Sequence, residues 1–179
     1  TDAPAQGATA VYVTIEEIRI CAEVGEEETG GSSNETADCT WKTITESAAT
    51  YNLLELVNGV TETLGVAELP VGTYHQMRLI IGSEPDTGIN LSGDTHPYAN
   101  YLINKNLHPL KVPSGEQNGI KLVKVFEIEE NRDTELILDF DAGRSIVTAG
   151  NKDDFILQPV IRVMDTKKMT RLTGIVNMI

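Results

Sequence analysis

Asp139 and Asp141, in the segment "LDFD", are the side chains whose type and spacing best suit metal binding. They alternate with Leu138 and Phe140, so both carboxylates would lie on the same face of a strand. Carboxylate oxygens are the ligands that calcium prefers, although the sequence lacks a DxDxDG loop. The sequence therefore offers one cofactor hypothesis, a structural calcium ion at Asp139 and Asp141. The alternative is a solvated acidic face.

Catalytic residues are not predicted. The three histidines, His75, His96 and His108, lie in separate segments and form no HxH or HExxH spacing. No GxSxG motif or phosphate-binding glycine loop is present in the sequence. The sequence offers no clustered acid, base or nucleophile, so we expect a protein that is not an enzyme.

Two cysteines, Cys21 and Cys39, flank an acidic, Gly- and Ser-rich excursion at 22–38. If the strands on either side pair as a hairpin, the cysteines meet at its base. A disulfide there would stabilise the fold by about 3 kcal/mol in the chain-entropy model and would favour an oxidising, extracytoplasmic compartment. The alternative is two free, buried cysteines.

A few further residues are candidates for glycosylation or for binding a sugar. Asn34 and Asn90 begin N-x-S/T triplets in expected loops and are candidate glycosylation sites. Trp41, with Tyr98 and Tyr101, could stack on a sugar, although core packing is the alternative for Trp41.

Two arginines, Arg78 and Arg162, interrupt otherwise apolar strands. We expect each to pair with a carboxylate across the sheet, with Asp139 the candidate for Arg162. Such pairs would be structural.

The elements that must position these residues are strands. Segments rich in β-branched and aromatic residues recur between turn signals, which predicts an all-β sandwich or barrel. One short helical turn is expected at 58–65. The strands are expected at 10–21, 40–45, 51–56, 72–82, 98–103, 107–112, 120–128, 134–140, 155–164 and 170–178.

Two irregularities are predicted within these strands. The apolar alternation changes parity around Glu16, which indicates a bulge and an edge or bend. Pro159 cannot donate to a ladder, so its position should be at an edge or bulge.

Composition limits the partners. The 179-residue chain has 27 acidic and 14 basic residues and a net charge of −13, which repels nucleic acid and anionic lipid surfaces. No apolar run reaches the roughly 18 residues that a membrane-spanning helix needs. We expect no nucleic-acid partner and no transmembrane segment.

Several stretches occur in an order that resembles a known family: "TDAPA", "LPVGTY", "PLKVPSG", "LDFDA" and "LQPVIRV". They are similar to the domain of unknown function 4382 family of secreted or lipid-anchored bacterial and archaeal proteins, over residues 1–165. The resemblance implies an immunoglobulin-like or prealbumin-like β-sandwich of roughly 8–10 strands. It also implies an extracellular or cell-surface location, with a lipid anchor before processing as a further hypothesis. It implies no activity.

The two ends depart from that family pattern. A strand that usually precedes "TDAPA" is missing, and an extension at 166–179 follows the expected sandwich at 1–165. We expect the extension to form a strand that fills the vacancy in its own sheet or in a neighbouring subunit. Its alternating residues are Leu172, Gly174, Val176 and Met178, followed by Ile179.

These observations predict a non-enzymatic extracellular structural protein that self-assembles into a filament or surface fibre by donating its C-terminal strand. The partner would be a second copy of the chain. The alternative is a monomeric cell-surface module that binds carbohydrate, including surface glycans, or calcium.

Overall fold

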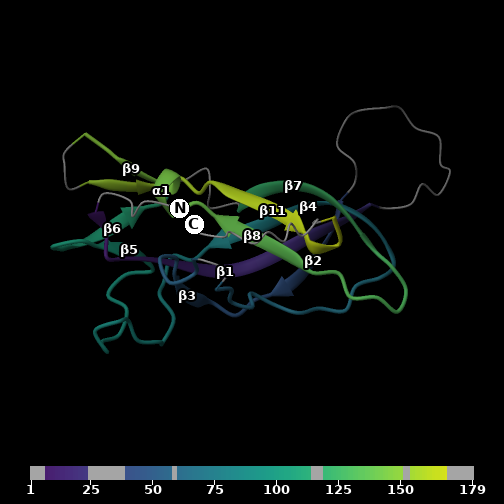
Figure 1. The fold of residues 1–179 in the computed structure, drawn as a ribbon, viewed down its shortest axis with the longest axis horizontal. Coiled ribbons are helices and arrows are strands. Elements are labelled where there is room, and N and C mark those ends of the chain that lie inside the picture. The colour runs from purple at the N-terminus through teal and green to yellow at the C-terminus, as the bar shows by residue number, and fades with distance from the viewer. Residues whose placement is uncertain (1–6, 24–38, 58–59, 114–118, 151–153, 169–179) are drawn as a thin grey trace, which may run out of the picture.

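The computed structural model describes residues 7–23, 39–57, 60–113, 119–150 and 154–168. Their regular secondary structure is mostly strand, with one short helix, α1 (Ala142–Ser145), and a 3-10 turn, η3 (Thr166–Lys168). Nine strands form one hydrogen-bonded sheet and two form a second, in a sandwich-like arrangement (Figure 1). The predicted all-β class is confirmed.

The longest strand, β1 (Ala10–Glu23), has neighbours on both edges. On one edge, β2 (Cys39–Thr45) and then β3 (Ala49–Asn52) pair antiparallel with it. On the other edge, β4 (Gly72–Ile81) pairs with the second half of β1, and β5 (Asn100–Ile103) pairs with the first half. Each edge of β1 is therefore covered by two strands, one after the other.

The outer strands extend the sheet beyond β4 and β5. Strand β7 (Ile120–Ile128) pairs with β4, and β6 (Leu107–Lys111) pairs with β5. Next to β6 lie β10 (Phe155–Leu157) and then β9 (Ile146–Thr148). The second sheet is the antiparallel pair β8 (Leu136–Phe140) and β11 (Ile161–Asp165).

The main core lies between one face of the large sheet and the β8–β11 pair. Val11, Val13 and Ile15 supply it from the first half of β1, and Ile18 and Ile20 from the second. Their parity changes because the register shifts between Ile15 and Glu17, which confirms the predicted bulge at Glu16. The predicted edge or bend falls where one side of β1 passes from β3, which pairs up to Ile15, to β2, which pairs from Ile18.

A second, smaller core lies on the opposite face of the sheet. Ala10, Tyr12 and Tyr101 form it, and each is almost fully buried. The side chains of a strand alternate between its two faces, so the same stretch of β1 supplies both cores. The second core therefore needs a cover that the β8–β11 pair cannot provide.

The predicted strand at 155–164 is two strands that belong to different sheets. Pro159 separates β10 from β11, so the proline breaks the strand instead of marking an edge or a bulge within it. The buried Ser145 fixes this break, because its carbonyl accepts from the N–H of Gln158 and its Oγ from the N–H of Val160.

Three further expectations can be compared with the structure. Residues 60–65 form no helix, so the helical turn predicted at 58–65 is wrong over the described part. Strand β9 and helix α1 were not predicted. The C-terminal strand predicted at 170–178 lies outside the described residues, as does the whole of 169–179. Within the described ranges, no helix is long and apolar enough to cross a bilayer.

Candidate functional site

The most elaborate polar structure of the described chain lies where residues 82–99 leave β4 and return to β5. We call this segment the 82–99 excursion. It is rich in Gly, Pro, Asp, Asn and Ser, the residues that favour turns. Irregular loops longer than about 12–15 residues are uncommon in compact domains and are often functional. In Figure 1 the excursion extends from β1 and β5 on the side opposite β8 and β11.

Asn100 closes the base of the excursion. Its Oδ1 accepts from the N–H of Thr14 at 3.1 Å, and its Nδ2 donates to the carbonyl of Gly82 at 2.8 Å. The N–H of Gly82 donates in turn to the carbonyl of Thr14. Thr14 of β1 thus bonds to the end of β4 and to the start of β5. These two strands therefore follow one another along the same edge of β1.

Asp86 ties the excursion to β3. Its carboxylate accepts from the N–H groups of Thr50, at 2.8 Å, and Gly88, at 2.9 Å. Burial raises the pKa of Asp86, but the two N–H donors and nearby His96 outweigh that effect and hold the pKa below its ordinary value. The Asp86 N–H donates to Thr50 Oγ1, which shares a 2.8 Å hydrogen bond with Thr14 Oγ1. This chain of bonds links β1, β3 and the excursion.

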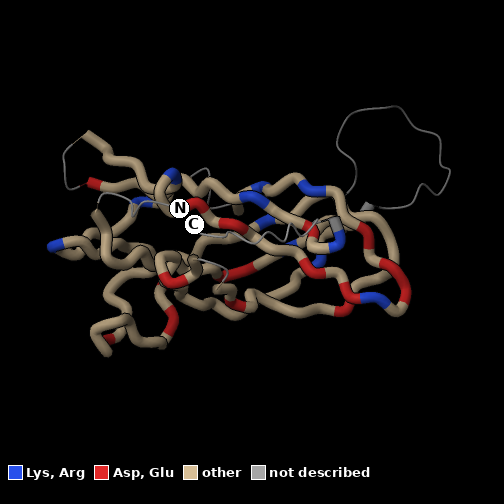
Figure 2. Tube along the Cα trace, viewed as in Figure 1, with Lys and Arg blue, Asp and Glu red and all other residues tan. Residues whose placement is uncertain are grey.

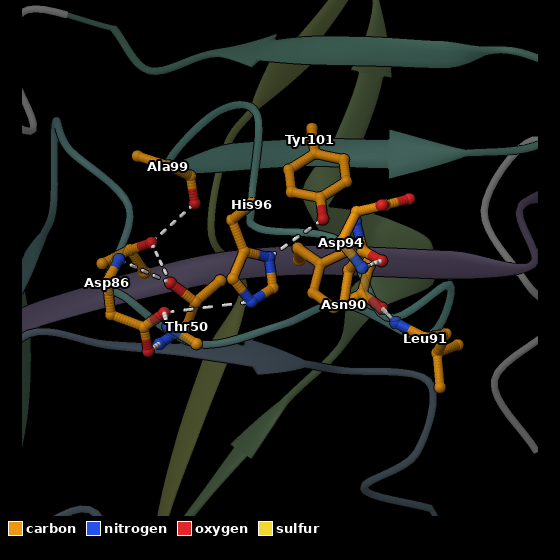
Figure 3. A network of polar contacts seen from close by, with 11 residues as sticks. Thr50, Asp86, Asn90, Leu91, Asp94, His96, Ala99 and Tyr101 are labelled. Atoms are coloured by element: carbon orange, nitrogen blue, oxygen red, sulfur yellow. Dashed lines mark hydrogen bonds and ion pairs between the residues drawn. The ribbon is translucent and has the colours of Figure 1, made fainter.

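His96 lies at the centre of this network (Figure 3). Its Nδ1 is 2.9 Å from the hydroxyl of Tyr101, and its Nε2 is 3.9 Å from Asp86 Oδ1. The ring contacts Tyr12 and Tyr101 edge-on, and its side chain is only 3% exposed. Burial raises the pKa of Tyr101 to about 12. His96 therefore acts as an internal support under the excursion and covers the second core.

The tip of the excursion is a compact turn organised by Asn90. Asn90 Oδ1 accepts from the N–H groups of Ser92 and Asp94, at 2.8 and 3.3 Å. The N–H of Leu91 donates to the buried hydroxyl of Tyr12 at 2.8 Å. The side chains of Ile89 and Leu91 nevertheless point outward and are 68% and 62% exposed. Two apolar side chains are thus displayed on a backbone that the second core holds in place.

A crevice of about 470 Å³ opens beside the base of the excursion. It includes Gly82 and Asn100 of the network, while Ser83 and Glu84 supply polar groups. The apolar part of its lining includes Pro85, Pro97, Tyr98, Pro109, Leu110 and Val112.

Residues of this region hold the loop backbone in position and expose apolar side chains to solvent. The imidazole of His96 and the phenol of Tyr101 are buried, and they hold the loop backbone. A ligand arriving from solvent would meet Ile89, Leu91 and the half-exposed Tyr98. The site has the organisation of a binding loop on a rigid support.

The two aspartates predicted to bind calcium have different surroundings. Asp141 caps α1, accepting from the N–H of Arg144 at 2.9 Å. Asp139 is exposed on β8, directly opposite Arg162, and an ion pair between the two stays a prediction. Among the described residues, no group of three metal-ligating side chains gathers. Calcium at these positions stays a prediction.

The two cysteine positions lie on the paired strands β1 and β2. Cys21 on β1 is directly opposite Trp41, and Cys39 is opposite Glu23, two residues further along. Both positions are therefore on the same face of the β1–β2 hairpin. None of the cysteines in the described part of the chain is free.

The remaining predicted residues are dispersed. Asn90 belongs to the loop tip, whereas Asn34 and the assembly residues Leu172, Gly174, Val176, Met178 and Ile179 lie outside the described residues. Tyr101 is buried, Tyr98 lines the crevice and Trp41 contacts Arg78, so the three aromatic residues form no common platform. Arg78 contacts an aromatic ring instead of the expected carboxylate.

The sequence interpretation missed the part that Asp86, His96 and Asn100 play in this polar network. One signal was available, namely the long Gly- and Pro-rich interval between two strong strand patterns. The polar side chains in it read as ordinary turn residues, because their partners Thr14 and Thr50 are distant in sequence.

The fold and the site together define an all-β, sandwich-like domain that displays a supported surface loop. The model of a family described as a domain of unknown function (DUF4382) matches residues 1–159. The chain belongs to this family, as its motifs predicted. It has no match among curated proteins and none among solved structures.

Proposed function

We propose that the protein is a non-enzymatic extracellular structural subunit that assembles by β-strand addition. The observation that carries this proposal is the outer strand β7, which among the described residues pairs only with β4. An unpaired strand edge presents free N–H and C=O groups to an incoming strand. Val123 and Val125 on β7 are 74% and 47% exposed, so an added strand would find apolar contacts there.

The strand to be added is the C-terminal segment of a second copy, whose alternation of Leu172, Gly174, Val176 and Met178 suits a half-buried strand. Lys121 and Lys124 on β7 would disfavour indiscriminate pairing, because edge lysines oppose aggregation. Heterologous addition of this kind generates a fibre.

Electron microscopy of negatively stained protein tests the assembly. We expect filaments from the intact chain, none from a chain truncated after Thr170, and none from Val123→Lys. The matched control is Val66→Lys, since Val66 is 87% exposed but lies outside the strands. Dispersed particles from the intact chain, or filaments from Val123→Lys, would contradict the proposal.

The expected compartment rests on a disulfide between Cys21 and Cys39. Their shared face on the β1–β2 hairpin and the lack of a free thiol among described residues support this pairing. A disulfide persists in oxidising surroundings, which supports location at the cell surface or beyond it.

A second function, a monomeric adhesion module, is favoured by the 82–99 excursion. Its outward Ile89 and Leu91 and the adjacent crevice form a surface that a carbohydrate or protein ligand could contact. Surface glycans presented on an array test this function. We expect binding to be lost in Tyr98→Ala and retained in Val66→Lys, whereas equal binding by both variants would exclude the crevice.

A further inference from the structure

Cationic side chains form a row across three adjacent strands on the outward face of the large sheet. Arg19 of β1 is directly opposite Arg78 of β4, and Arg78 is directly opposite Lys121 of β7. Directly paired residues share a face, so the three side chains project together. They project away from the main core, which receives the intervening Ile20, Met77 and Leu122. We call Arg19, Arg78 and Lys121 the basic row.

Only one end of the basic row is neutralised. Arg19 makes two hydrogen bonds with the carboxylate of Glu17. Over the residues that the structure describes, Arg78 and Lys121 have no ion pair. Like charges directly opposite one another disfavour the sheet by roughly 0.2–1 kcal/mol. Among the described residues, two adjacent unneutralised cations are therefore a local cost, in a chain whose net charge is −13 and whose acidic residues are spread over the fold (Figure 2).

Trp41 holds one of these cations in place. The Arg78 guanidinium lies 4.5 Å from the centroid of the Trp41 ring, and both side chains are half-buried. Stacking of this kind restricts the guanidinium while its N–H donors stay available for a carboxylate. Val123, which is directly opposite Gln76 and 74% exposed, adds an apolar surface beside the row.

We propose that Arg78, Lys121 and Trp41 form a binding site for an acidic saccharide, whose carboxylate binds the two cations while its sugar ring packs against the adjacent apolar surface. The site lies on the face of the sheet, where backbone groups are used in the strand ladders. A polypeptide could not be held there by backbone pairing, whereas a saccharide needs only side-chain donors and an apolar surface.

The overall charge limits the ligand further. Long-range repulsion from a net charge of −13 opposes dense polyanions such as nucleic acids and anionic membranes. A short oligosaccharide with few carboxylates experiences less of this repulsion. The inference does not depend on strand addition at β7.

Trp41 is the single tryptophan of the chain, so tryptophan fluorescence reports on this site alone. The probe is trigalacturonate, titrated into the intact protein at low salt, with its carboxyl-reduced neutral form as the ligand control. We expect a saturable change in emission with trigalacturonate, weakened by added salt, and none with the neutral form. Calorimetry of the same titration gives an affinity independent of fluorescence.

The key variant is Lys121→Gln, because Lys121 is exposed and contacts no aromatic ring. We expect its affinity for trigalacturonate to fall at least tenfold, with a thermal stability equal to or slightly above that of the original chain, because the repulsion from Arg78 is relieved. Lys105→Gln makes the same change of charge outside this row and should bind as the original chain does. Equal binding by Lys121→Gln, or equal binding of the neutral trisaccharide, would overturn the proposal. Tighter binding of triglutamate than of trigalacturonate would also overturn it, in favour of an acidic peptide.

Discussion

The hydroxyl of Tyr12 accepts a hydrogen bond from the backbone N–H of Leu91, 79 residues away in sequence. Tyr12 is 3% exposed, whereas the side chain of Leu91 is 62% exposed. A buried residue of the central strand thus fixes the backbone of a residue that displays its side chain to solvent.

Tyr12→Phe removes this acceptor and retains the ring. We expect a loss of about 1 kcal/mol in the free energy of unfolding, since one neutral hydrogen bond is lost. Amide exchange at Leu91 should accelerate, while exchange in β4 and β7 stays nearly unchanged. Uniform acceleration throughout the sheet would show that Tyr12 stabilises the whole fold and not the loop alone.

Asn100→Ala leaves two buried backbone groups without partners, the N–H of Thr14 and the carbonyl of Gly82. Each unsatisfied group costs roughly 1–3 kcal/mol, so we expect a loss of about 3 kcal/mol in denaturant unfolding. Asn106→Ala, at an exposed position, is the matched control and should lose less than about 0.5 kcal/mol. Equal stabilities of the two variants would contradict the role given to Asn100.

Asp86 makes stability depend on acid pH. Its folded pKa lies below its ordinary value, so its contribution is fully present above the unfolded pKa of about 3.9 and is lost as pH falls through the folded pKa. Asp86→Asn should reduce stability by about 1–2 kcal/mol at pH 7, because one N–H donor loses its acceptor. The difference between the two proteins should shrink as the pH is lowered below 4, as chemical denaturation at each pH would measure.

Tyr101 makes stability depend on alkaline pH, with the opposite sign: stability falls as the pH rises. Its folded pKa of about 12 exceeds the ordinary value of 10.0, so its contribution is complete below pH 10 and is lost as pH rises through 12. We expect one tyrosine to ionise near pH 12 in a spectrophotometric titration, with a loss of on the order of 2 kcal/mol in stability across that range. Tyr101→Phe should abolish that step. Its persistence in the variant would assign the step to another tyrosine.

The proposed disulfide between Cys21 and Cys39 predicts a redox-dependent stability. Cys21→Ser should cost about 3 kcal/mol by enlarging the unfolded ensemble. Reductant should destabilise the original chain by the same amount and leave Cys21→Ser unaffected. A free thiol in the intact, oxidised protein, detected by alkylation and mass spectrometry, would exclude the bond.

The strands could be predicted because their signals are local. The alternation in β1, including the parity change at Glu16, is written in consecutive residues, and the register there follows it. The break at Pro159 was only half predicted, because the separation of β10 from β11 into different sheets depends on contacts with Ser145.

The candidate site could not be predicted in the same way. Asn100, Asp86 and His96 are ordinary polar residues in sequence, and their roles arise from partners in β1 and β3. The basic row could not be predicted from the sequence either, because Arg19, Arg78 and Lys121 become neighbours only through strand register.

The base of the 82–99 excursion has a consequence for how this domain can diversify. Because Gly82 and Asn100 meet beside the same residue of β1, and Asp86 and His96 anchor the loop between them, the outward tip can change while the strands keep their register. A library randomised at the outward positions Ile89 and Leu91 would sample new recognition surfaces on one unchanged framework. The same tip would accept a grafted foreign peptide, which makes the domain a usable scaffold for display.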